Sequence, residues 1–366
     1  MSACTLPTPC LTLDQTLLGQ NIQRMQTEVN QAGKHLRPHV KTHKCPELAK
    51  RQIAAGAIGI CVTKVSEARV MAEQGIGNIL ITSPVVTTAK LEQLALCHKC
   101  DPDLLVVCDS MDNARQLNAM ATHPLNVLVD IDPGVGRTGV AYANALALGL
   151  FIDQHCPQLR LQGIQCYAGN LQHIVSYEER KTASLVVLTK AAAVKQQFLD
   201  NGLCCDIMTG SGTGTYEMDM TLDAVTEVQP GSYTVMDREY HNIGSSDDAH
   251  TFTRFNPAML LCTTVISANH DTHVTVDAGT KALYFDAHTR PKIVSHPGLQ
   301  YDWSVFGDEH GKVTADPGVP LPKVGEVLQM VVPHCDPTIN LHNIFYVIEN
   351  GQVVDQWPIA ARGCVA

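Results

Sequence analysis

Short apolar runs alternate with longer amphipathic stretches through the first two-thirds of the chain, and this alternation constrains the fold more than any other feature. The apolar runs cover residues 36–40, 58–62, 78–82, 104–108, 127–131, 161–165 and 205–209. Strands that alternate with helices form right-handed crossovers and a parallel sheet. Seven or eight such units fit a (β/α)8 TIM-type barrel, which usually takes about 250 residues. A doubly wound open sheet is the alternative, but no G-x-G-x-x-G follows the first strand.

The pattern changes near Met236, where helical periodicity largely stops. Short strand-like runs joined by Gly, Pro, Asn and Asp turns occupy the rest of the chain. The sequence therefore predicts an α/β protein with a barrel over residues 15–236. A mostly antiparallel β domain is predicted over residues 237–366.

Composition narrows the class of protein. The 366 residues carry a net charge of −10, and no Lys/Arg cluster is present, so we expect neither nucleic acid nor a membrane surface as partner. The N-terminus lacks the pattern of a secretory signal, and no apolar run is long enough to cross a bilayer. We expect a cytoplasmic protein whose 14 cysteines are free thiols.

Barrel enzymes carry their chemistry at the carboxyl ends of the strands, and two glycine-rich turns are predicted there. One turn runs from Thr209 to Thr215 and the other from Pro230 to Tyr233. Glycine lets backbone N–H groups approach an anion closely, so both turns are candidate phosphate sites. Lys41 ends the first predicted strand beside other cationic groups, which favours a reactive amine; a solvated basic loop is the alternative.

A second group of polar residues lies in the β domain, in the segment 333–342. His334 and Asp336 are two residues apart, so on a strand both would lie on one face, with Cys335 on the other. A histidine plus a carboxylate suits a divalent ion such as Mn²⁺, Mg²⁺ or Zn²⁺. A turn with a hydrogen-bonded histidine is the structural alternative.

Taken together, the segments Arg37–Pro46, Gly134–Gly139, Thr209–Thr215, Pro230–Tyr233 and Pro333–His342 resemble the fold-type III pyridoxal 5'-phosphate (PLP) enzymes with an alanine-racemase-like N-terminal domain. The likeness covers nearly the whole chain and is to the branch of D-threonine aldolase, 3-hydroxy-D-aspartate aldolase and D-serine dehydratase. It implies a homodimer that acts on a small D-amino acid. It also implies an N-terminal strand within residues 1–14 that joins the β domain.

The resemblance also implies residue roles. Lys41 matches the lysine that binds PLP as a Schiff base, and Arg137 matches an arginine beside the cofactor ring. Tyr167 and His173 match active-site positions, and His334 and Asp336 match the metal pair. The remaining positions that match cofactor-binding residues are Thr209, Gly212, Thr213, Gly231, Ser232 and Tyr233.

The segment 333–342 also distinguishes the reactions within this branch of the family. The aldolases resemble His-Cys-Asp-Pro-Thr-x-Asn-x-His there, as does this chain, whereas the dehydratases resemble His-x-Cys. We therefore expect a lyase that cleaves a D-3-hydroxy amino acid to glycine and an aldehyde. A D-serine or D-3-hydroxyaspartate dehydratase and an amino-acid racemase are the alternatives. Two departures lie near the expected substrate site: Ala168 follows Tyr167, and Glu239-Tyr240-His241 replaces Asp-Tyr-Gly.

Overall fold

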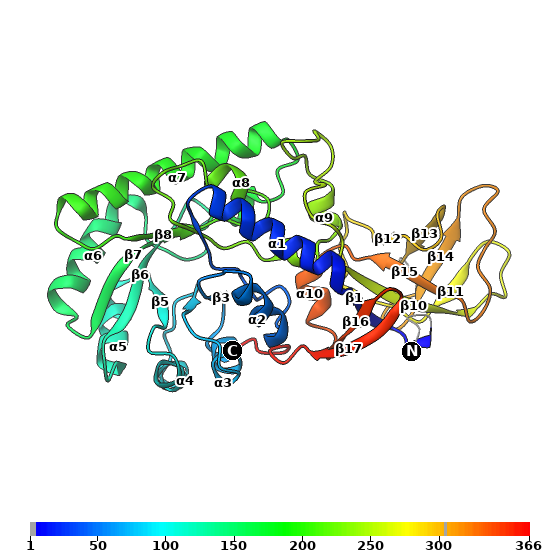
Figure 1. Cartoon of the computed structure of the whole chain (residues 1–366), viewed down its shortest axis with the longest axis horizontal. Coiled ribbons are helices and arrows are strands. Elements are labelled where there is room, and N and C mark those ends of the chain that lie inside the picture. Colours follow the sequence, from blue (N-terminus) through cyan, green and yellow to red (C-terminus); the bar gives the residue numbers. More distant parts are fainter. Residues whose placement is uncertain (1–4, 304–305) are drawn as a thin grey trace. The chain divides into compact units, whose positions relative to one another are not determined.

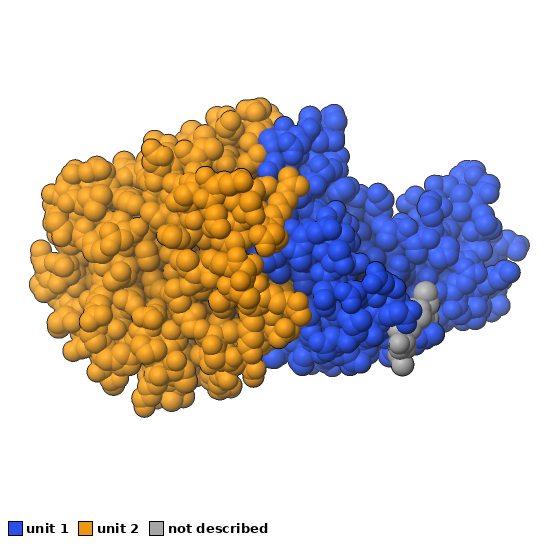
Figure 2. Space-filling model, viewed as in Figure 1, with its two compact units in different colours: residues 1–22, 42–45, 232–362 blue, residues 23–41, 46–231, 363–366 orange. Residues whose placement is uncertain are grey.

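The computed structural model describes residues 5–303 and 306–366, so residues 1–4 of the predicted N-terminal segment 1–14 lie outside it. The chain divides into two compact units, coloured separately in Figure 2. We call residues 23–41, 46–231 and 363–366 the barrel unit, and residues 1–22, 42–45 and 232–362 the β unit. Helix α1 (Gln15–Gln31) begins in the β unit and ends in the barrel unit.

Eight parallel strands form the sheet of the barrel unit, as the alternating pattern predicts. They are β2 (His35–Leu36), β3 (Ile60–Val62), β4 (Ile79–Ile81), β5 (Leu105–Cys108), β6 (Leu125–Ile131), β7 (Leu159–Cys166), β8 (Ile207–Gly210) and β9 (Glu227–Val228). Their order is β2-β9-β8-β7-β6-β5-β4-β3. Nearly every strand residue is buried, because a parallel sheet is covered on both faces.

Backbone hydrogen bonds also join the two ends of this strand order. Leu36 O accepts from Ile58 N over 2.9 Å, Pro38 O accepts from Cys61 N over 2.8 Å, and Val40 N donates to Cys61 O over 2.9 Å. The segment that follows β2 therefore runs alongside β3, as in a TIM-type barrel. The predicted strand 36–40 is shorter in the structure because Pro38 has no N–H to donate to a ladder.

Helices separate the strands of the barrel unit (Figure 1). They are α2 (Pro46–Ala54), α3 (Val65–Glu73), α4 (Thr88–Cys100), α5 (Met111–Met120), α6 (Tyr142–His155), α7 (Tyr177–Asp200) and α8 (Tyr216–Asp219). Ser110 and Ser176 cap α5 and α7, since each hydroxyl accepts from the backbone N–H three residues ahead. Among the described residues, no helix has the length and apolarity needed to cross a membrane.

The β unit is built on a nine-stranded, mostly antiparallel sheet. Its strands are β1 (Cys10–Asp14), β10 (Met259–Ser267), β11 (Val274–Val276), β12 (Lys292–Ile293), β13 (Leu299–Asp302), β14 (Gly311–Ala315), β15 (Val327–Val331), β16 (Ile344–Glu349) and β17 (Gln352–Pro358). The N-terminal strand β1 lies between β10 and β16 and is parallel to β16. The predicted fold class, a barrel followed by an antiparallel β domain, is confirmed.

One local prediction is wrong. His334 and Asp336 do not share one face of a strand, because β15 ends at Val331 and the short helix α10 (Cys335–Ile339) begins one residue after His334. Pro337 lies in the first turn of α10, where a missing N–H costs nothing. His334 is the N-cap, so the segment is a strand-to-helix turn. A second short helix of this unit is α9 (Arg238–His241).

Candidate active site

Five neighbouring strands of the barrel unit carry predicted cofactor residues just beyond their carboxyl ends. In the order β2-β9-β8-β7-β6, these residues are Lys41, Gly231, Thr213, Tyr167 and Arg137. The strands are parallel, so their carboxyl ends meet at one edge of the sheet. Barrel enzymes build their active sites at this edge, and the residues were predicted from segments far apart in sequence.

Lys41 lies in a turn that hydrogen bonds of His39 hold in place. His39 N donates to Pro230 O over 3.1 Å, and Lys41 N donates to His39 Nδ1 over 3.4 Å. The His39 ring also contacts the Thr82 hydroxyl through Nε2 at 3.1 Å. Lys41 is half-buried. These contacts tie the turn of Lys41 to the strand that leads into Gly231, which argues against the alternative of a solvated basic loop.

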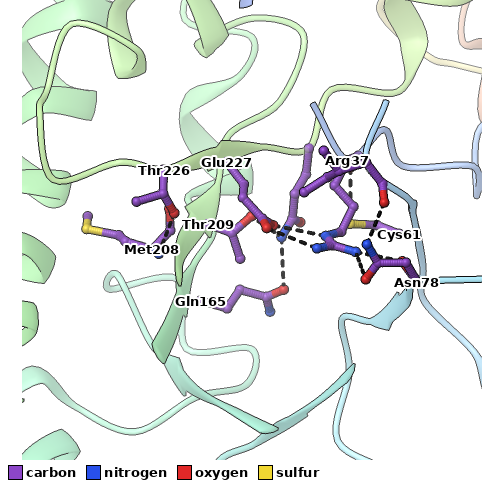
Figure 3. Close-up of polar contacts among 10 residues, drawn as sticks. Arg37, Cys61, Asn78, Gln165, Met208, Thr209, Thr226 and Glu227 are labelled. Carbon is purple, nitrogen blue, oxygen red and sulfur yellow. Dashed lines mark hydrogen bonds and ion pairs between the residues drawn. The ribbon is translucent and has the colours of Figure 1, made fainter. Parts of the chain in front are cut away.

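Arg37, four residues earlier, is buried inside the barrel unit and anchors this strand end (Figure 3). Its guanidinium donates to both carboxylate oxygens of Glu227, over 2.9 and 3.0 Å, and to Asn78. Burial lowers the pKa of Arg37, but the Glu227 pair outweighs it and raises that pKa. A buried charge of this kind is stable only when fully paired. Thr209 belongs to the same interior layer, where its hydroxyl accepts from Gln229 Nε2 over 2.9 Å.

The glycine-rich turn after β8 is packed around a buried amide. Gln172 Oε1 accepts from Gly214 N over 3.1 Å, and Gln172 Nε2 donates to Thr215 Oγ1 over 3.0 Å. A Cβ added to Gly212 would lie 2.4 Å from Gln172 Oε1, and one added to Gly214 would lie 2.1 Å from Gln172 O. Both glycines are therefore required by close packing, and Ser211 between the strand and Gly212 has a φ of 72°.

Two charged residues support the same turn from behind. Arg180 of α7 is buried and donates through Nε to Gly214 O over 2.7 Å; its Nη1 donates to Ile174 O. Asp219 of α8 is buried and accepts from Ser184 Oγ over 2.5 Å. Burial raises the pKa of Asp219 to about 6, against hydrogen bonds from Ser184, Thr215 and Ser211 that lower it. The turn is thus held in one shape, as a phosphate cradle requires.

Arg137 and Tyr167, predicted to flank the cofactor, lie together. The Arg137 guanidinium carbon lies 5.4 Å from the centre of the Tyr167 ring, within the range of a cation–π contact. Arg137 is exposed and Tyr167 half-buried. His173 is exposed on the segment between the short helix Gly169–Leu171 and α7, directly after the buried Gln172. The barrel unit therefore presents a lysine, an arginine, an aromatic ring, a histidine and a glycine cradle, which fits a phosphorylated aromatic cofactor.

In the β unit, the predicted metal ligand His334 is oriented by an acid that the sequence did not reveal. Asp237 Oδ2 lies 3.0 Å from His334 Nδ1 and accepts from Cys335 N over 2.9 Å. Asp237 is fully buried. Glu239 Oε2 also lies near the His334 ring, 3.4 Å from Nδ1. A carboxylate on Nδ1 leaves Nε2 as the atom that can bind a metal. Asp237, His334 and Cys335 form a group close enough to surround an ion.

The electrostatics of this group favour a cation. Burial lowers the pKa of His334, but Asp237, Asp336 and Glu239 outweigh it and raise that pKa to about 9. The same negative surroundings would stabilise a divalent ion. The predicted partner Asp336 accepts from Ser232 Oγ over 3.4 Å, so a residue predicted for phosphate binding contacts one predicted for metal binding. Ser232 and Tyr233 are both buried in the short helix Ser232–Thr234.

Four residues that support the site were not predicted from the sequence: Asp237, Gln172, Arg180 and Asp219. Gln172 was the most accessible to prediction, because it precedes His173 in a segment already singled out. Asp237 lies 97 residues from His334 in the chain. No local spacing rule connects such a pair, so only the fold identifies it.

Comparison with known proteins places this arrangement in a family. The alanine racemase N-terminal domain matches residues 13–239, and the serine dehydratase domain matches residues 258–348. The chain therefore belongs to the fold-type III PLP enzymes with an alanine-racemase-like N-terminal domain.

Particular relatives narrow this class. The chain is 38% identical to D-threonine aldolase from Arthrobacter sp., with 97% of this chain and 93% of the relative covered. It is 33% identical to 3-hydroxy-D-aspartate aldolase from Paracoccus denitrificans, with 99% and 94% covered. The crystal structure of D-threonine aldolase from Filomicrobium marinum superposes with a TM-score of 0.91 at 36% identity, covering 100% of this chain and 98% of that one.

Proposed function

We propose that this chain is a PLP- and divalent-metal-dependent lyase that cleaves a D-3-hydroxy amino acid, such as D-threonine, to glycine and an aldehyde. The observation that carries the proposal is the likeness to two aldolases over almost the entire chain. The orientation of His334 by Asp237 supports a metal site in the segment that resembles the aldolase motif. From the resemblance we further propose a homodimer, and from the sequence pattern a cytoplasmic protein.

Residues between Lys41 and Ser232 would hold the cofactor and one proton. Lys41 Nζ would carry PLP, which supplies an electron sink when bound. Backbone and hydroxyl donors of the Gly212-Thr213 and Gly231-Ser232 turns would bind its phosphate. A ring nitrogen of His173 would take the proton of the substrate's β-hydroxyl as the Cα–Cβ bond breaks. The electron pair of that bond stays with Cα, which then accepts a proton to give glycine.

The β unit's residues would hold the ion. His334 Nε2 and a carboxylate oxygen of Asp336 are the proposed ligands, and a bound divalent ion lowers the pKa of a hydroxyl that it contacts. Asp237 would have a positioning role, because its two oxygens are already occupied by Tyr240 N, His334 Nδ1 and Cys335 N. The choice between Mn²⁺, Mg²⁺ and Zn²⁺ belongs to experiment.

The dehydratase is the second candidate, and one observation favours it: residues 258–348 match the serine dehydratase domain. In that reaction the amine of Lys41 would remove the Cα proton and the β-hydroxyl would leave as water. Hydrolysis of the released product would then give a keto acid and ammonia. Ammonia in place of glycine therefore distinguishes the two candidates. A racemase would need a second base on the opposite face of the cofactor, and no predicted site residue supplies one.

The cofactor assignment is tested at Lys41. We expect Lys41→Ala to abolish turnover of D-threonine and the absorbance of lysine-bound PLP. Lys50→Ala, at an exposed position of α2, is the matched control and should retain both. Full activity in the Lys41→Ala protein would refute the proposed cofactor chemistry.

A further inference from the structure

The β unit contains a cavity that the proposed reaction does not use. It offers about 80 Å³ of space to water-sized groups and opens to solvent. Its walls come from α9, β12, β15 and the segment 255–257. All four elements belong to the β unit, so the cavity is defined within one compact body. This space is several times what a single water molecule needs.

Two cationic side chains and a histidine line this cavity: Arg238 and His241 of α9, and Lys292 of β12. The Nε of Arg238 is buried and has no hydrogen-bond partner among the described residues. A buried guanidinium nitrogen that lacks an acceptor is costly, so a ligand that supplies one is bound favourably. Lys292 is exposed, and His241 is half-buried.

The charges in the cavity are not neutralised by its own walls. Asp237 is the one acid among the lining residues, and both of its oxygens are already used. Oδ1 accepts from Tyr240 N over 3.0 Å, and Oδ2 contacts His334 and Cys335 N. Burial lowers the pKa of His241, and the charges of Arg238 and Lys292 lower it further, which is the signature of a positive potential.

The rest of the lining is apolar. Phe255 and Val331 are buried, and Pro257 and Val294 complete this face. A ligand with only charge, such as chloride or inorganic phosphate, would leave these groups in contact with water. A hydrocarbon body with one anionic end would cover them and reach the cations.

We propose that this cavity binds a small carboxylate with a short aliphatic body, held by Arg238 and Lys292. The planar guanidinium fork matches a carboxylate in a two-bond geometry, and the lysine adds a point charge. The neutral ring of His241 offers one further N–H donor. The inference does not depend on the proposed reaction, since none of these three residues has a role in it.

Calorimetric titration of the holoenzyme, loaded with PLP and Mn²⁺, tests this site with butyrate as the probe. We expect saturable binding of butyrate and none of its uncharged isostere butyramide or of chloride at equal ionic strength. Arg238→Gln and Lys292→Gln should each weaken the binding of butyrate about tenfold, the effect of losing one charge-assisted contact. Lys323→Gln, at an exposed position of the same unit, should leave the affinity unchanged.

The two variants separate the possible results. Lys292 is exposed, so Lys292→Gln tests the site even where Arg238→Gln fails to fold. Butyrate that binds all variants with equal affinity occupies another place, and the proposal is then wrong. Absence of saturable butyrate binding to the unmodified holoenzyme would overturn it too.

Discussion

Gln172 holds Thr215 through a hydrogen bond of 3.0 Å from Nε2 to Oγ1, while the other end of the same amide accepts from Gly214 N. One buried side chain thus satisfies both a donor and an acceptor of the glycine-rich turn. Because His173 is its immediate neighbour, the residue proposed as base and the proposed phosphate cradle share one support. The arrangement of the barrel unit's site depends on this amide.

Replacing the amide of Gln172 should therefore weaken the binding of PLP. Gln172→Leu keeps the approximate volume but leaves Gly214 N without an acceptor, which costs about 1–3 kcal/mol. We expect the Kd of PLP to rise at least about tenfold, measured by absorbance titration of cofactor-free protein. Gln197→Leu, exposed on α7, is the control. An unchanged Kd would show that the turn keeps its shape without Gln172.

Arg180 should contribute to folding stability. Arg180→Met removes the hydrogen bonds that the guanidinium donates to Gly214 O and Ile174 O, so it leaves two carbonyl oxygens without these donors. We expect the free energy of unfolding to fall by about 3 kcal/mol, measured by urea denaturation. Lys190→Met, exposed on the same helix, should change it by less than about 0.5 kcal/mol. Equal effects of the two substitutions would contradict the role given to Arg180.

Asp219 should make stability depend on pH in a defined window. Its pKa is about 6 in the folded chain against 3.8 ordinarily, so between these values the folded state keeps a proton that the unfolded state loses. Stability from this residue is therefore present below about pH 4 and is lost as the pH rises to about 6, by roughly 3 kcal/mol in total.

Asp219→Asn removes this titration, so its free energy of unfolding should fall less than that of the unmodified protein between pH 4 and 6. Asp223→Asn, at an exposed position, should follow the unmodified protein. Chemical denaturation at several pH values measures the difference. Parallel curves for the unmodified and Asp219→Asn proteins would show that Asp219 is ionised throughout.

Asp237 should determine metal affinity without touching the ion. Asp237→Asn keeps the shape of the side chain but removes the charge that holds His334 Nδ1. We expect Mn²⁺ affinity to fall about 10–100-fold, measured by direct titration of metal-free protein. Asp316→Asn, exposed in the same unit, serves as the comparison. Equal Mn²⁺ affinity in both proteins would exclude the positioning role.

The parallel strands could be predicted because each is buried on both faces and forms an apolar run. Their ends were less accurate, as at β2, where the pattern extends to Val40 but Pro38 interrupts the ladder. The strand predicted for His334 and Asp336 failed because two residues of spacing fit a helix start as well as a strand.

The residues of the candidate site also differ in whether the sequence identifies them. Residues in motifs, such as Lys41 and His334, could be identified because their chemistry stands out against the local sequence. Supporting residues could not, since Arg37 with Glu227 and His334 with Asp237 are pairs separated by 190 and 97 residues. Contacts over such distances follow from the closure of the barrel and the path of the sheet.

The central claim is carbon–carbon cleavage, and one assay measures it directly. Purified protein with PLP and Mn²⁺ is offered D-threonine, D-3-hydroxyaspartate and D-serine separately, and glycine and ammonia are quantified in parallel with and without EDTA. We expect glycine from D-threonine or D-3-hydroxyaspartate, lost on addition of EDTA and restored by excess Mn²⁺. Ammonia without glycine would contradict it and identify a dehydratase.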